Sequence, residues 1–201
     1  MIRTLVRAII LAIDRALIRR YGIFEFNSNP SSILRVSFEH NKKDRVLSDG
    51  FRVAPGEKVL AVHLRNEYMP SFSTWGADLG WAKQFLRLFA ESLVDLAFFI
   101  RDDPRCKDIR LIWGTILLFA EPHRMVRRFG FHLERIEGKH AWESFLLFWP
   151  RLFAFALIWA FNPRRLKCNA LSRGRLYRLY WSRKNLVALT SDKSSHHRRM
   201  T

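Results

Sequence analysis

Cysteine is scarce in this sequence. Cys106 and Cys168 are the only cysteines among 201 residues, and neither lies in a CxxC or Cys/His pattern. Two isolated cysteines exclude a disulfide-rich scaffold and favour a reducing compartment. His196 and His197 lie in the polar, charged segment "SDKSSHHRRMT", which is typical of a solvated tail. No metal site is therefore predicted.

Recognisable catalytic motifs are also absent. The sequence contains no P-loop, no HExxH, no Ser-His-Asp order and no paired-carboxylate motif. Asp102 and Asp103 are adjacent, at the end of an expected helix, where a solvated cap is the simpler interpretation. The sequence alone therefore does not name a reaction.

Acidic residues are few, and the resulting positive charge is unevenly distributed. The chain has 35 lysines and arginines against 18 acidic residues, a formal net charge of +17. Residues 163–201 hold 11 of the basic residues and one acidic residue, Asp192. Such a segment predicts a polyanionic neighbour. No aromatic RNA-binding motif or helix-turn-helix signature is present. An anionic membrane surface is therefore the expected partner, rather than nucleic acid.

The first twenty residues predict an amphipathic helix. The apolar run between Arg7 and Asp14 is too short for a signal peptide or a membrane span. Arginines occupy the polar face, and Leu11 and Ile18 are its apolar exceptions. The helix suits an anionic membrane interface, where Arg3, Arg7 and Arg15 would make contacts. A helix packed on its own domain is the alternative. The apolar face comprises Ile2, Leu5, Val6, Ile9, Ile13, Ala16 and Leu17.

The middle of the chain predicts an α+β fold with a mixed, mostly antiparallel sheet and flanking helices. Apolar residues alternate in the expected strands and recur at helical spacing in the expected helices. The expected strands are residues 21–26, 33–40, 58–64, 108–119 and 131–137, and the expected helices are 80–104 and 121–130.

The last third begins with an aromatic-rich apolar segment, residues 145–161, interrupted only by Pro150 and Arg151. An interfacial or re-entrant helix, a helix buried against the domain and a true span are all open readings. Residues 176–186, "LYRLYWSRKNL", alternate aromatic residues with arginine, as at the level of lipid headgroups. The expected membrane contacts here are Trp149, Trp159, Arg164 and Arg165.

These patterns divide the chain into three parts. Residues 1–20 form the amphipathic helix and residues 21–140 form the α/β core. Residues 141–201 contain the apolar helix and a basic C-terminal segment, packed on or beside the core.

His63 is the best single candidate for a catalytic residue. On the strand "KVLAVHL", Leu60, Val62 and Leu64 share one face, and His63 lies on the other. His63 could act as a general base, with Asn66 or Glu67 nearby in sequence; a packed, hydrogen-bonded imidazole is the alternative. Candidate ligand or phosphate contacts are Arg65, Asn66, Arg124, Arg127 and Arg128, and an exposed helix face would explain the last three equally well.

The succession of long helix, apolar strand, short helix and "RRFGF" resembles the second half of the GCN5-related N-acetyltransferase fold. In those enzymes a loop of pattern (Arg/Gln)-x-x-Gly-x-(Gly/Ala) opens the long helix and holds the pyrophosphate of acyl-coenzyme A. The corresponding segment here, "STWGADLGWAK", has Gly76 and Gly80 at a different spacing and no leading basic residue. No cofactor is therefore expected, and acyl-coenzyme A enters only under an acyltransferase alternative with a divergent loop.

A second resemblance is to the YkoP-like group of bacterial proteins, some of which are joined to polysaccharide deacetylases. It rests on "LSDGFRVAPGEKVLAVHLRNE", "WGTILL", "RRFGF", "NPRR" and "YWSRKNL", which are spread along the chain. This resemblance implies a bacterial envelope setting. The expected function is that of a binding or accessory protein in envelope lipid or glycan metabolism, attached peripherally to the cytoplasmic face of the membrane. The sequence predicts no oligomeric state.

Overall fold

The computed structural model describes residues 2–46, 50–70, 79–118, 130–137, 141–161 and 174–189. Within them the chain forms helices and strands in an α+β arrangement, and residues 183–189 are also helical. The elements are α1 (Ile2–Arg20), β1 (Leu34–His40), β2 (Arg45–Val46), β3 (Arg52–Val53), β4 (Lys58–Leu64), η1 (Asn66–Tyr68), α2 (Leu79–Asp102), η2 (Pro104–Cys106), β5 (Leu111–Leu118), β6 (His132–Arg135), α4 (Ala141–Phe161) and β7 (Arg175–Ser182).

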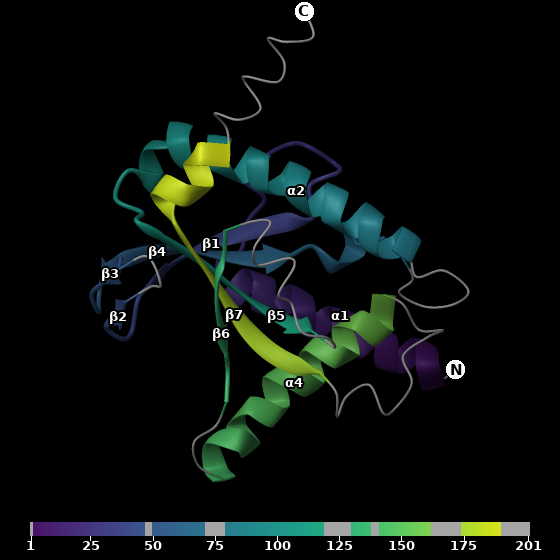
Figure 1. Cartoon of the computed structure of the whole chain (residues 1–201). Helices are drawn as coiled ribbons and strands as arrows, with labels where there is room; N and C mark the ends of the chain where they lie inside the picture. Colours follow the sequence, from purple (N-terminus) through teal and green to yellow (C-terminus); the bar gives the residue numbers. More distant parts are fainter. Residues whose placement is uncertain are drawn as a thin grey trace, which may run out of the picture.

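Five strands form one twisted sheet in the order β1-β4-β5-β7-β6 (Figure 1). The β4–β5 pair is parallel, and the β1–β4, β5–β7 and β6–β7 pairs are antiparallel. Strands β2 and β3 form a separate antiparallel hairpin. The sheet is mixed and mostly antiparallel, so the expected fold class is confirmed at this level.

Helix α2 covers one face of the sheet, and the helical residues 183–189 lie beside it (Figure 1). Apolar residues recur along α2 every three or four positions, as a helix packed on a sheet requires. The buried side chains of α2 are Phe85, Phe89, Ser92, Leu93, Leu96, Ala97 and Ile100. They pack in one core cluster with Leu60, Val62, Ile112, Leu179 and Trp181 of the strands.

The opposite face of the sheet, called here the polar face, carries the alternate residues of the same strands. Helices α1 and α4 lie on this side of the sheet (Figure 1). A second, smaller apolar cluster forms under the β2–β3 hairpin, from Val53, Val59, Leu111 and Tyr180, with Phe51 and Trp113 against it.

The parallel pair β4–β5 is short. Three residue pairs join the strands, the last being Val62 with Gly114, although β4 continues to Leu64 and β5 to Leu118. A Cβ atom at position 114 would lie 3.0 Å from the carbonyl oxygen of Val62, so glycine permits the close approach of the two strands.

Two expectations were wrong. Residues 21–26 do not form a strand: only Phe24 makes a bridge, to Val36, because the phenyl rings of Phe24 and Phe26 pack on Phe99 of α2 instead of continuing a ladder. Residues 176–186 do not lie at a headgroup level. They supply most of β7, which is largely buried between β5 and β6. The C-terminal part of the chain thus contributes a strand within the sheet.

The other expected elements agree where the structure describes them. Helix α2 spans 79–102 against the expected 80–104, and β5 and β6 lie within the expected strands 108–119 and 131–137. The expected helix 121–130 lies almost wholly outside the described residues.

Candidate functional site

His63 lies on the polar face of β4, half-buried, with Nε2 2.9 Å from the Oγ of buried Ser37 on β1. Burial lowers the pKa of the imidazole to about 4, so the ring is neutral at pH 7. Ala61, two residues before His63 on the same face of β4, is fully buried. His63 therefore has a hydrogen-bond partner and lies in a largely covered part of the sheet.

The carboxylate of Glu39 lies near Ser37, two residues along the same strand. Burial raises the pKa of Glu39, against the opposing effects of Lys42, Ser37 and Arg178. The Ser37 hydroxyl therefore satisfies one nitrogen of the imidazole, and His63 lies near a carboxylate on the neighbouring strand.

Arg65 follows β4 and is only 4% exposed. Its guanidinium pairs with Glu25 at 3.1 Å, donates to the carbonyl oxygen of Ser32 at 3.3 Å and lies 3.9 Å from the ring centre of Tyr68. His63 and Arg65 therefore interact with different residues and do not contact a common group in the described part of the chain. Asn66 begins η1 and is half-buried. The roles predicted for Arg65 and Asn66 in ligand binding remain predictions.

A cluster of charged groups joins α1 to the sheet beside Arg65. Arg35 of β1 pairs with both Glu25 and Glu67. Asp14 of α1 lies near Glu67 and Arg35, and its pKa is raised, chiefly by burial and next by the Glu67 carboxylate. Asp14 therefore faces the protein rather than the solvent.

The polar face contains a small pocket, called here the Trp113 pocket, with a volume of about 160 Å³. Arg178 of β7 lies with its guanidinium 4.8 Å from the ring centre of Trp113. Glu134 of β6 accepts hydrogen bonds from Tyr180 at 2.8 Å and from Arg45 at 2.9 Å. The lining residues are Glu39, His40, Asn41, Lys42, Arg45, Val59, Leu111, Trp113, Arg178 and Tyr180.

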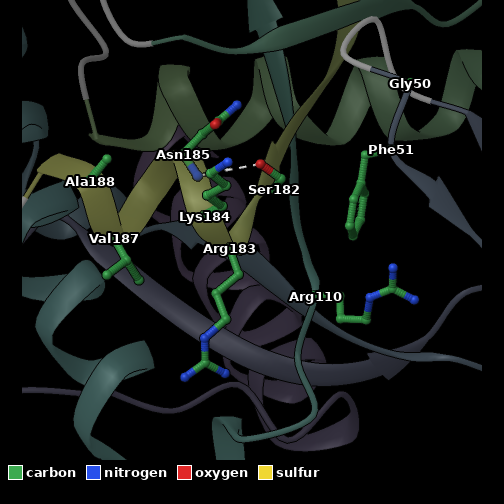
Figure 2. A pocket seen from close by; sticks show the side chains of 9 residues that line it. All are labelled: Gly50, Phe51, Arg110, Ser182, Arg183, Lys184, Asn185, Val187 and Ala188. Carbon is green, nitrogen blue, oxygen red and sulfur yellow. Dashed lines mark hydrogen bonds between the residues drawn. The ribbon is translucent and has the colours of Figure 1, made fainter.

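A larger and shallower groove of about 870 Å³ lies between Phe51, Arg110 and the helical residues 183–189 (Figure 2). Arg110 lies 4.7 Å from the ring centre of Phe51 and pairs with Glu57 at 3.5 Å. Arg183 points away from Lys184 and Asn185 (Figure 2) and donates to the backbone carbonyls of Ile100, Cys106, Lys107 and Ile109. Arg183 thus holds the end of β7 to α2 and to the segment between α2 and β5. Arg110 and Lys184 are the exposed cations on the lining of this groove.

Helix α1 turns its apolar stripe outward. Leu5 is 64% exposed and Ile9 is 51% exposed, and Val6, Ile13 and Ala16 are exposed as well. The half-buried side chains are Ile10, Leu11, Asp14, Leu17 and Ile18. Leu11 and Ile18, the apolar exceptions on the polar face of the wheel, are thus among the residues that face the protein. Arg7 and Arg15 are exposed, as expected for membrane contacts; the side chain of Arg3 is outside the described part.

Helix α4 is exposed in its first half and packed in its second. Trp142 and Phe145 are each 61% exposed, and Phe148 and Trp149 are exposed too, whereas Leu157 and Ala160 are buried and Trp159 is half-buried. In the part of the chain that the structure describes, no helix is long and apolar enough to cross a membrane. Five other candidate residues lie outside the described ranges: Arg124, Arg127, Arg128, Arg164 and Arg165.

Sequence reasoning missed the Trp113 pocket altogether. The alternation within residues 176–182 places Arg178 and Tyr180 on one face of a strand. The sequence therefore shows which residues of this strand share a face. It does not show that Tyr180 lies opposite Trp113 and Arg178 opposite Thr115, because this register joins segments far apart in the chain.

No curated protein and no solved structure matches the chain. The model of one family, the YkoP domain, matches residues 3–189, which include every strand of the sheet, helices α2 and α4, and all of α1 but its first residue. The chain therefore belongs to the YkoP domain family.

Proposed function

We propose that this chain is a peripheral membrane-associated binding protein that serves bacterial envelope lipid or glycan metabolism from the cytoplasmic face of the membrane. The observation that carries the proposal is the orientation of α1. Its apolar stripe, which would cover the core if the helix served only to pack on its own domain, is exposed at Leu5, Val6, Ile9 and Ile13.

The charges beside the stripe favour an anionic surface over another apolar partner. Arg7, Arg15, Arg19 and Arg20 are all exposed on α1, and the whole chain carries a net charge of +17. An interfacial helix combines an inserted apolar face with arginines at the level of the anionic headgroups. The exposed Trp142 and Trp149 of α4 fit the same surface, because indole rings favour the interface.

Vesicle sedimentation tests this proposal. The full chain should sediment with phosphatidylcholine vesicles that contain phosphatidylglycerol, and high salt should release only part of it, because the apolar stripe stays inserted. It should bind pure phosphatidylcholine weakly. Burying one isoleucine is worth about 1.5–3 kcal/mol, so Ile13→Asp should weaken binding about tenfold or more.

Thr4→Asp is the matched control, since Thr4 is exposed on the opposite side of α1 and the change in charge is the same. It should retain most of the binding. A full chain that stays in the supernatant at low salt, or a Thr4→Asp variant as weak as Ile13→Asp, would contradict the proposal.

The second candidate is an acyltransferase with a divergent cofactor loop, as in the acetyltransferases that the sequence resembles. One observation favours it: the ladder between β4 and β5 ends at Val62 and Gly114, beside His63, while both strands continue. Against it, Gly80 is already part of α2 rather than of a preceding loop, and Gly76 lies outside the described residues.

Calorimetry separates the two candidates. Coenzyme A and acetyl-coenzyme A should bind weakly or not at all, because a divergent glycine spacing and the lack of a leading basic residue remove the expected pyrophosphate cradle. Micromolar affinity for either compound would favour the acyltransferase.

A further inference from the structure

The Trp113 pocket combines an apolar floor with charged groups of both signs. Val59, Leu111 and Tyr180 are buried beneath it, and Trp113 packs against them. Its volume of about 160 Å³ is enough for one six-membered ring, since cavities of about 150 Å³ admit benzene. The pocket is therefore of the right size and lining for a single ring with polar substituents.

Arg178 leaves one donor of the pocket unsatisfied. Its guanidinium lies over Trp113 and near Tyr180. Its Nε atom is buried and has no hydrogen-bond partner among the described residues. A buried donor without a partner costs about 1–3 kcal/mol. Because Arg178 lines the pocket, a small shift of its side chain would let this Nε–H meet an acceptor on a ligand or a water.

Glu39 requires a hydrogen-bond donor from a ligand, whereas Arg178 requires an acceptor. The Glu39 carboxylate is half-buried on the same lining and lies near Ser37, Lys42 and Arg178. An ionised carboxylate accepts hydrogen bonds only, and it can accept several. A ligand in this pocket must therefore offer a donor to Glu39 as well as an acceptor to Arg178.

A hydroxyl group meets both requirements, because it donates and accepts. A phosphate or carboxylate would suit Arg178 and Lys42, but it would bring a second negative charge beside Glu39. An apolar ring would leave Arg178 and Glu39 unpaired. A neutral ring with hydroxyl substituents fits, since its C–H groups can contact the half-buried Trp113 beside the Arg178 guanidinium while its hydroxyls bind the rim.

We propose that the Trp113 pocket binds a neutral monosaccharide unit, with Arg178 and Glu39 as its hydrogen-bonding partners and Trp113 as its apolar contact. This inference deepens the proposed function, because it names a glycan rather than a lipid as the ligand. It rests on the proposal that the chain is a binding protein and does not depend on membrane attachment. Vesicle attachment and sugar binding are measured separately, so either can fail without the other.

The test uses the full chain without vesicles, with glucose, galactose, N-acetylglucosamine and inorganic phosphate as probes in ligand-observed NMR and calorimetry. At least one sugar should bind, and phosphate should not displace it. Loss of a hydrogen bond to a charged group should weaken that sugar about tenfold or more in Glu39→Gln and in Arg178→Gln.

Matched controls are Arg110→Gln, in the larger groove, and Glu137→Gln, an exposed carboxylate beyond β6; both should bind as the parent chain does. Circular dichroism spectra must first show that each variant is folded, and Glu39→Gln keeps the test valid if Arg178→Gln does not fold. Binding of none of the three sugars would overturn the inference. So would displacement by phosphate, or sugar affinity unchanged in Glu39→Gln.

Discussion

At the scale of single residues, the burial of His63 couples folding to pH. The folded-state pKa is about 4, against about 6.5 for an exposed histidine. Between these two values the unfolded chain takes up a proton that the folded chain does not, so the free energy of unfolding falls as the pH drops below about 6.5. Above that pH the contribution of His63 is fully present.

The expected loss between pH 7 and pH 5 from this residue is on the order of 2 kcal/mol at most. His63→Gln removes the titrating group, so its stability should fall less over that range than that of the parent chain, whatever its stability at pH 7. Urea unfolding at the two pH values measures this. His40→Gln, which changes an exposed histidine, is the matched control. Equal pH dependence in His63→Gln would show that burial does not hold His63 neutral.

At the scale of elements, α1 is attached by half-buried side chains only. In its described side chains, residues 4–20, none is fully buried, and α1 adds no strand to the sheet. The helix ends at Arg20, and Gly22 follows it with a φ of 59°, the left-handed conformation that terminates helices. Helix α1 is therefore a peripheral element, in contrast to α2, which fills the core.

Deletion of residues 1–20 should leave the rest of the chain folded, with a single cooperative thermal transition, and should weaken sedimentation with anionic vesicles. The melt and the near-ultraviolet circular dichroism spectrum check the first expectation. If the shortened chain lost its cooperative transition, α1 would be part of the core, and its outward stripe would need an explanation other than membrane attachment.

At the scale of the whole molecule, local patterns were sufficient for elements with a single clear period. The sequence predicted α2 from its apolar stripe, because this stripe packs on a sheet. It predicted β5 from its apolar run, because β5 lies at the centre of the sheet. Strand β7 was misread, since its arginines and aromatic residues fit a headgroup surface as well as a sheet. The ladder that pairs β7 with β5 places it in the sheet, and this ladder joins segments far apart in the chain.

The candidate site shows the same limit. His63 was identifiable on its strand, but its hydrogen-bond partner Ser37 comes from the neighbouring strand, and this contact depends on the β1–β4 register. The sequence left open whether α1 lies in a membrane interface or packs on its own domain. The half-buried Ile10, Leu11, Asp14, Leu17 and Ile18 show which side of the helix faces the protein.

The most direct test of membrane attachment through α1 is a nitroxide scan of that helix in a chain with both cysteines replaced by alanine. Labels at positions 5, 9 and 13 should become accessible to oxygen and shielded from a water-soluble relaxation agent when phosphatidylglycerol-containing vesicles are added. Labels at positions 4 and 15 should stay accessible to the water-soluble agent. If positions 5, 9 and 13 remain as accessible to that agent with vesicles as without them, the apolar stripe does not enter the membrane and the account is wrong.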